Sequence, residues 1–244
     1  MNGIFEKKIF KYLSVVSIFL LAYILRFYNL NGEDFWTDEM FAYWTADPNI
    51  SFKDTIIRTL SSNFNSLFDF FLKSFHIIFG YNVYTSRYFV LFFSLISLIL
   101  FAYLLNNISS YKSFIFGFFL LSINIFHIKY SQELRSYIVT FVLALIFIIL
   151  NFKKGKIENN ISYKKILAIS FLSILMLLNH SFSILILLSL ILFKFLSFIK
   201  TKEIVIKDIF LVLSLSIIIL LYLLIYLPIN ISYSEYFETS LAPH

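Results

Sequence analysis

Seven long apolar runs dominate the chain and constrain its fold more than any other feature. They lie near residues 9–28, 86–106, 112–129, 135–152, 165–182, 182–200 and 208–229. Each run, with its flanks, is long enough to cross about 30 Å of hydrocarbon as a helix. With 60% hydrophobic and 14% charged residues, the chain has too little polar surface for a water-soluble globule. We therefore predict an all-α polytopic membrane protein of about seven spans, with residues 1–244 as a single module.

The distribution of basic residues predicts the orientation of these spans. When the N-terminus is placed in the cytoplasm, lysines dominate the inner segments, whereas every arginine and most acidic residues fall outside. Positive charge collects on the cytoplasmic side of membrane proteins, so this placement follows the usual bias. The sequence predicts a multi-pass protein of the cell (plasma) membrane with a cytoplasmic N-terminus. The net charge of +6 is then topological, and nucleic acid is excluded as a partner.

Two further features narrow the class of protein. Lys7, Lys8 and Lys11 precede the first run as in a signal peptide, but no small-residue cleavage site follows it. We therefore expect a retained anchor. The chain has no cysteine, which excludes disulfides and thiolate metal sites.

The first outer loop, residues 29–85, is long enough to hold structure of its own. Its second half predicts an amphipathic helix in the outer membrane interface, with Asp69, Lys73 and His76 on the polar side. A weaker helix is expected to start near Trp36. The apolar side of the stronger helix comprises Phe64, Leu67, Phe68, Phe71, Leu72, Phe75, Ile78 and Phe79.

The distinctive polar residues gather at the outer ends of the spans. Asp38 and Glu39 follow Trp36 in the first loop, residues 130–137 separate the third and fourth spans, and His180 lies between the fifth and sixth. Arg26 and Arg87 flank the first loop. The centres of the spans hold no ionisable residue, and such residues usually mark ion and substrate pathways. A transporter is therefore the less favoured alternative.

Each candidate also has a purely structural explanation. Ser131 would be a suitable N-cap for the fourth span, with Glu133 in its first turn, where a carboxylate suits the helix dipole. Asp38 and Glu39 would then be solvated loop residues, and His180 a turn residue at the interface. The convergence of all of them on one face favours a functional site.

The pattern of these residues resembles that of a known family, the membrane-embedded GT-C glycosyltransferases. Within this family it is most similar to the branch that contains the protein O-mannosyltransferases and the lipid A aminoarabinose transferase. The W-x-D-E element in the first outer loop is matched by Trp36-Thr37-Asp38-Glu39. A tyrosine-serine-glutamine-glutamate-x-arginine-x-tyrosine segment is matched by residues 130–137. His180 follows the fifth span, and Ser86-Arg87-Tyr88 opens the second. The resemblance covers essentially the whole chain.

The chain departs from the family pattern in two places. The prolines that usually open the amphipathic helix are missing from Asn63-Phe64-Asn65-Ser66-Leu67-Phe68-Asp69. Family members also usually continue with further spans, whereas this sequence ends at His244. We expect a minimal form, a fragment or a subunit that depends on a partner.

The resemblance implies transfer of a sugar from a polyprenyl-phosphate donor to an acceptor on the outer face. Asp38 is then the expected catalytic base of a single inverting displacement, which needs a carboxylate near the attacking hydroxyl. Glu39 belongs to the same catalytic element and acts through loop structure or a metal. Arg135 and Arg87 are expected to bind the donor phosphate, because the planar guanidinium donates in pairs to phosphate oxygens.

Further polar residues near the expected catalytic and phosphate-binding residues are predicted to have supporting roles. Glu133, His180, Tyr130 and Gln132 are expected to support the site, and a divalent metal at Asp38, Glu133 and His180 would suit their oxygen and imidazole ligands. The alternatives are a non-catalytic or truncated membrane subunit that binds polyprenyl lipid, and a lipid or sugar transporter. The sugar and the acceptor, whether glycan, lipid or protein, stay open.

Overall fold

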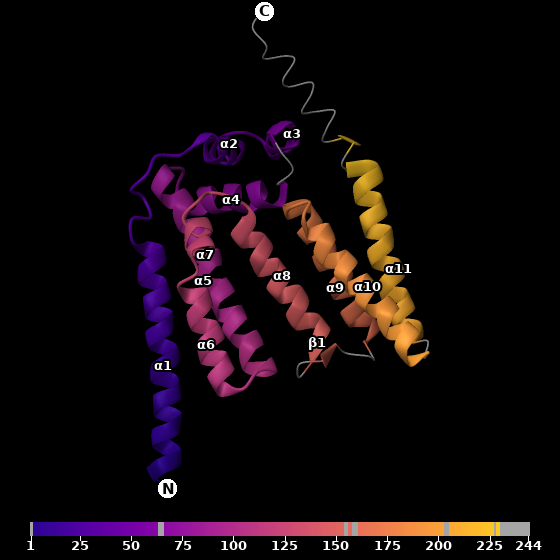
Figure 1. Cartoon of the computed structure of the whole chain (residues 1–244). Helices are drawn as coiled ribbons and strands as arrows, with labels where there is room; N and C mark the ends of the chain where they lie inside the picture. Colours follow the sequence, from indigo (N-terminus) through magenta and orange to yellow (C-terminus); the bar gives the residue numbers. More distant parts are fainter. Residues whose placement is uncertain are drawn as a thin grey trace, which may run out of the picture.

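The computed structural model describes residues 2–62, 66–153, 156–157, 161–202, 205–226 and 228–229. Most of the described residues are helical. The long helices form a bundle whose members run roughly along one direction, and the short α7 follows α6 (Figure 1). The helices of the bundle are α1 (Asn2–Phe27), α5 (Val83–Ile108), α6 (Tyr111–Ser122), α7 (Ile125–Tyr130), α8 (Tyr137–Asn151), α9 (Tyr163–Asn179), α10 (Ser183–Thr201) and α11 (Ile206–Leu221).

Three further helices cover one end of the bundle. They are α2 (Thr37–Thr45), α3 (Phe52–Ser62) and α4 (Ser66–Phe79), and α4 lies crosswise over the ends of the long helices (Figure 1). This end is called the α4 end below. At the opposite end, the β1 end, strands β1 (Phe152–Lys153) and β2 (Lys156–Ile157) pair antiparallel. A π-helical turn, Tyr222–Tyr226, extends α11.

The described helices are those of a membrane-embedded protein. Helices α5, α10 and the segment Ile206–Tyr226 are each long and apolar enough to cross a bilayer. Large apolar side chains also face away from the bundle, as Leu167 (71% exposed) and Leu185 (64% exposed) do. Lipid can cover such apolar surfaces, whereas their exposure to water would be energetically unfavourable. The predicted all-α membrane fold is confirmed at this level.

Each predicted apolar run lies on a helix, but the third run is broken. Helix α6 ends at Ser122, and α7 begins after Asn124, whose side chain accepts from His127 N at 2.8 Å. Residues 112–129 are therefore two helices rather than the one that hydropathy predicts. The physical reason is that the Asn124 side chain caps a new helix N-terminus in the middle of the apolar run.

A buried arginine holds this break in place. Arg26 of α1 is fully buried, and its Nη atoms donate to Ser122 O (2.8 Å) and Leu121 O (3.1 Å) at the end of α6. Its Nε donates to His127 Nδ1 (3.1 Å), so His127 Nε2–H faces Ser97 Oγ (2.8 Å) on α5. The network ties α1, α5 and α7 together. Arg26, which flanks the first loop, thus packs the end of α1 against α6 and α7.

The main core lies where α4, α5, α8, α9 and α11 meet. Its fully buried side chains include Leu72, Val90, Val139, Ile169 and Leu215. A smaller cluster of Ala22, Leu98 and Phe118 joins α1, α5 and α6. The helices that carry the α4-end residues therefore pack on one another directly.

Helix α4 is amphipathic as predicted, but its polar side is buried. Asp69, Lys73 and His76 are each less than 5% exposed, because α2 and α3 lie over that side. Lys73 Nζ donates to Asp47 O and Ile50 O, both at 2.7 Å, and His76 Nδ1 donates to Ala46 O at 2.9 Å. The opposite side exposes Ile78 and Phe79. The predicted start of this helix at residues 63–65 lies outside the described residues.

Candidate functional site

Apart from Arg87 of α5, the predicted site residues come from three segments that meet at the α4 end. These are the loop before α2 with the first turn of α2, the turn between α7 and α8, and the tip between α9 and α10. Glu39 joins the first two segments, since its Oε1 accepts from Leu134 N at 2.7 Å. Tyr137, at the end of the second segment, packs against His180 of the third, with 5.4 Å between the ring centroids. The three segments therefore form one continuous region at the α4 end.

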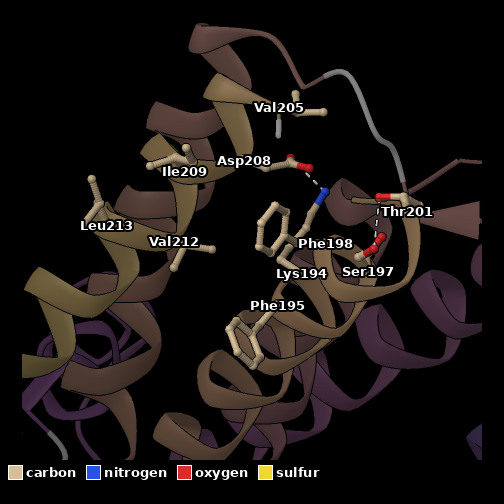
Figure 2. Close-up of a pocket in the computed structure, with 10 residues that line it drawn as sticks. All are labelled: Lys194, Phe195, Ser197, Phe198, Thr201, Val205, Asp208, Ile209, Val212 and Leu213. Atoms are coloured by element: carbon tan, nitrogen blue, oxygen red, sulfur yellow. Dashed lines mark hydrogen bonds and ion pairs between the residues drawn. The ribbon is translucent and has the colours of Figure 1, made fainter. Parts of the chain in front are cut away.

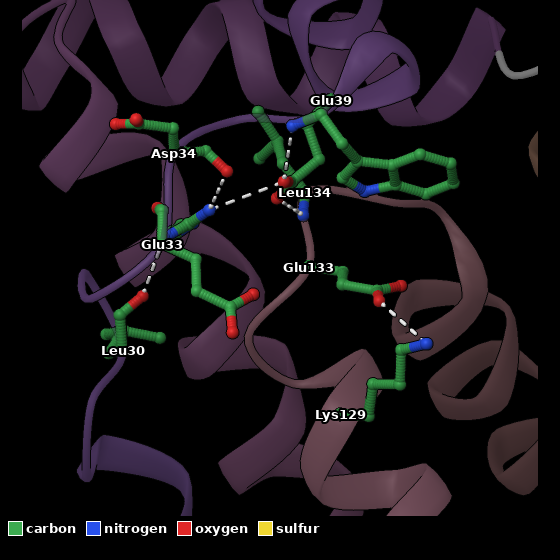
Figure 3. Close-up of polar contacts among 9 residues, drawn as sticks. Leu30, Glu33, Asp34, Glu39, Lys129, Glu133 and Leu134 are labelled. Carbon is green, nitrogen blue, oxygen red and sulfur yellow. Dashed lines mark hydrogen bonds and ion pairs between the residues drawn. The ribbon is translucent and has the colours of Figure 1, made fainter.

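The carboxylate of Glu39 is buried in a network with Arg87 (Figure 3). Arg87 Nη2 lies 3.3 Å from Glu39 Oε2, and both side chains are about 95% buried, with exposures of 5% and 2%. Arg87 also donates to Leu30 O (3.1 Å), Glu33 O (2.6 Å) and Asp34 O (3.3 Å). The structure thus places this predicted phosphate ligand where it anchors the loop before α2 to α5.

The loop itself needs particular residues at its first turn. Asn29 has φ of 58°, in the left-handed region that asparagine tolerates, and Gly32 N donates to Asn29 O at 3.0 Å. A Cβ at Gly32 would collide with the Asn29 side chain. This tight turn sends the chain from α1 directly over Arg87.

Asp38 has a different environment from Glu39, although the two are adjacent. Its Oδ2 lies 2.9 Å from Arg135 Nη1, and the Asp38 side chain is 39% exposed, that of Arg135 21%. Adjacent helical residues point about 100° apart, which separates a buried carboxylate from an accessible one. Of the two predicted catalytic carboxylates, Asp38 is therefore the one that a substrate can reach.

Aromatic rings frame the Asp38–Arg135 pair. The Arg135 guanidinium lies 5.7 Å from the ring centroids of both Trp36 and Tyr137, within cation–π range. Tyr137 in turn packs against Tyr130 (4.7 Å) and His180 (5.4 Å). Arg135 Nε is buried and has no hydrogen-bond partner among the described residues. The guanidinium thus keeps an unused donor for an oxygen ligand.

The turn between α7 and α8 differs from the prediction. Ser131 caps the end of α7, and α8 begins at Tyr137 after Ser136. Glu133 therefore lies in the turn rather than in the first turn of a helix, and it pairs with Lys129 at 3.4 Å. Gln132 donates to Arg26 O and Tyr28 O, at 3.1 and 2.8 Å. The Ser131 N-cap prediction is wrong because the backbone closes α7 there instead.

The structure does not bring the three predicted metal ligands together. Asp38 pairs with Arg135, Glu133 with Lys129, and His180 packs on Tyr137. Within the described residues, no group of three or more His, Asp or Glu side chains is placed to hold a metal ion. A divalent metal at Asp38, Glu133 and His180 stays a prediction.

A buried carboxyl on α4 was missed by the sequence reasoning. Asp69 is 4% exposed and accepts from Thr59 Oγ1 at 2.9 Å. Burial raises the pKa of Asp69 to about 8, against the opposing effects of this hydrogen bond and of the nearby Arg135 charge. A carboxyl at helical spacing among apolar residues gives no signal that separates a buried one from a solvated one.

The pKa of Asp69 predicts a pH dependence of stability. Because the folded protein holds this proton more tightly than the unfolded chain, stability should fall as pH rises from about 4 to about 8. Asp69→Asn keeps an acceptor for Thr59 and should flatten this fall, which melting temperatures in detergent at pH 5 and pH 9 can measure. The exposed Asp54→Asn is the control, and equal slopes in wild type and Asp69→Asn would contradict the prediction.

A pocket lies at the β1 end of the bundle (Figure 2). It has a volume of about 300 Å³ between α10 and α11, and Lys194 Nζ lies 2.8 Å from Asp208 Oδ1 at its edge. Phe195, Phe198 and Val212 supply apolar walls. The ion pair joins the two helices, and the pocket holds none of the predicted site residues.

No family model matches the chain, and no curated protein or solved structure matches it either.

Proposed function

We propose that the chain is a membrane-embedded glycosyltransferase that moves a sugar from a polyprenyl-phosphate donor to an acceptor. The observation that carries the proposal is the Asp38–Arg135 pair, accessible at the α4 end and framed by Trp36 and Tyr137. It sets a carboxylate beside a guanidinium with an unused donor. Glycosyl transfer from a lipid phosphate needs both groups, one to take the hydroxyl proton and one to stabilise the departing phosphate.

In this proposal Arg135 exchanges partners during the reaction. The donor phosphate competes with Asp38 for the guanidinium, since charge-assisted bonds to phosphate are among its strongest. Asp38, released from Arg135, then accepts the proton of the acceptor hydroxyl as that oxygen forms the bond to the anomeric carbon. The bond from that carbon to the phosphate oxygen breaks, and the lipid phosphate leaves with its electron pair. His180 and Tyr130 support the wall behind Tyr137.

The proposal includes seven spans with the α4 end outside the cell. Helix α6 has 12 residues, about 18 Å at 1.5 Å per residue, so it crosses only together with α7. The apolar residues Ile78 and Phe79 of α4 suit the outer interface. The lipid tail of the donor would lie along the exposed apolar faces of the bundle.

Cysteine labelling tests this orientation in a chain that has no cysteine of its own. Lys53→Cys lies on α3 at the α4 end, and Asn107→Cys lies near the other end of α5. A membrane-impermeant maleimide should label Lys53→Cys in intact cells, and Asn107→Cys only after lysis. The reverse pattern would place the candidate site in the cytoplasm and remove the proposal.

Arg135→Lys tests phosphate recognition. Lysine keeps the charge but loses the planar pair of donors, so we expect the affinity for a polyprenyl-phosphate sugar to fall by about tenfold. Binding of a fluorescent short-chain donor in detergent measures this. Arg58→Lys, on α3 beside Trp44, serves as the matched control. Unchanged affinity in Arg135→Lys would move the phosphate site elsewhere.

The activity itself is tested with purified protein and a panel of polyprenyl-phosphate sugars. Release of free polyprenyl phosphate in the presence of acceptor is the expected result. A chain that binds these donors but releases no phosphate with any of them would instead be a non-catalytic membrane subunit. Measurement with and without a chelator at the same time tests the predicted metal.

A further inference from the structure

A cavity of about 590 Å³ lies beside the Asp38–Arg135 pair, between the loop before α2 and the α7–α8 turn. Its charged lining comprises four acidic residues, Glu33, Asp34, Glu39 and Glu133, and two basic ones, Arg87 and Lys129. The volume falls in the range of small-molecule sites. Neither Asp38 nor Arg135 lines the cavity, but Trp36 does, and its ring also contacts the Arg135 guanidinium. Trp36 is therefore a wall common to the cavity and the candidate site.

The charge of the cavity selects its ligand. Within the described part of the chain, the carboxylates of Glu33 and Asp34 have no hydrogen-bond or ion-pair partner, and both residues are exposed. Glu133 pairs with Lys129, which also lines the cavity and whose side chain is 63% exposed. Arg87 is neutralised by the buried Glu39. The remaining excess of negative charge disfavours a phosphate or a carboxylate and favours an ammonium group.

The buried side of the cavity contains a hydrogen-bond donor that lacks an acceptor. Arg87 Nε is buried and has no hydrogen-bond partner among the described residues, although the Arg87 side chain is only 5% exposed. A buried N–H without an acceptor is costly, and a ligand hydroxyl oxygen would satisfy it. Trp36, which is 50% exposed, offers a ring face. Carboxylates, an unused donor and an indole together fit a molecule that carries both hydroxyl and amine groups.

We propose that this cavity binds the acceptor, and that the acceptor is an amine-bearing, hydroxyl-rich molecule such as an amino sugar. The inference rests on the proposed function, because it names the substrate that receives the sugar. The anionic donor lies on the Arg135 side of Trp36, and the cationic acceptor lies on the Glu33 and Asp34 side. Opposite charges on the two sides of one ring keep the two substrates from exchanging places.

Binding is measured without any chemistry, by the fluorescence of Trp36. The chain has two tryptophans, so Trp44→Phe leaves Trp36 as the only reporter. The glucosamine disaccharide is titrated into this protein in neutral detergent, and its fully N-acetylated form serves as the uncharged probe. We expect a saturable change with the free amine and at least about tenfold weaker binding of the acetylated form.

Substitutions in the cavity lining test whether the amine probe binds in this cavity. Glu33→Gln with Asp34→Asn should weaken binding of the glucosamine disaccharide by at least about tenfold. Asp54→Asn, an exposed carboxylate of α3 outside the cavity, should leave it unchanged. Equal affinity for the amine and acetylated probes would overturn the proposal, as would unchanged amine affinity in the double variant. Asp38→Asn should bind the amine probe normally, so loss of turnover in that variant tests the proposed function alone.

Discussion

Asp38→Asn is expected to lower the rate of sugar transfer by roughly 10²–10⁴-fold, the usual cost of removing a general base. The asparagine has nearly the same shape as aspartate but cannot take the proton of the acceptor hydroxyl. Single-turnover release of polyprenyl phosphate, with donor and acceptor both saturating, measures the chemical step. Donor affinity should stay within a few-fold, because Arg135 rather than Asp38 binds the phosphate in this proposal.

The geometry makes this substitution a clean test. The Asp38–Arg135 pair is partly exposed, and such ion pairs contribute about 0–1 kcal/mol to folding. The variant should therefore fold normally, which its melting temperature can show. Asp54→Asn on α3 controls for the loss of one carboxylate at the α4 end. More than about a tenth of the wild-type rate in Asp38→Asn would assign the base to another group.

Hydropathy predicted the helices well because apolar runs leave the backbone few alternatives in lipid. Every predicted run lies on a helix, and both helices expected in the first loop, around Trp36 and around Asp69, are present. The break at Ile123–Asn124 was missed, since hydropathy averages over single residues. The Asn124 side chain was the one local signal that could have found it. Asn is a favoured N-cap and a poor residue for the middle of a helix.

The sequence predicted that the candidate site residues lie close together, but it did not predict which of them pair. Motif spacing selected Asp38, Glu39, Arg87 and Arg135, and the structure brings them together as two pairs at one end of the bundle. Which carboxylate is buried depends on the rotation of α2 about its own axis, and no pattern within its nine residues encodes that. The burial of Arg26 was not predictable either, because its partners lie about 100 residues away on α6 and α7.

Helix α4 has a different environment from the one that its sequence predicts. A helix with one polar side usually turns that side to water, as the sequence predicts. Here α2 and α3 cover it, and backbone carbonyls of the segment that joins them replace water as acceptors for Lys73 and His76. The same spacing of residues is therefore compatible with a polar side that faces water and with one that is buried. The packing of α2 and α3 decides between the two.

Glu39→Gln is expected to destabilise the fold by about 3–5 kcal/mol, the range for breaking a buried ion pair from one side. The carboxylate accepts from Leu134 N, Arg87 Nη2 and Trp36 N at 2.7, 3.3 and 3.4 Å. An amide offers one oxygen to these donors and turns an N–H₂ group toward the others. Arg87 would then stay buried as an uncompensated cation, and the loop before α2 would lose its anchor.

Glu133→Gln is the matched control for this prediction, because the same substitution there breaks a pair whose lysine is 63% exposed. It should cost no more than about 1 kcal/mol. Denaturant titration in detergent, followed by circular dichroism, compares the two variants. If the ion pair is the cause, Glu39→Gln combined with Arg87→Met should recover part of the loss, since no charge is then left buried. Equal stability of Glu39→Gln and Glu133→Gln would instead show that the buried pair does not hold the loop.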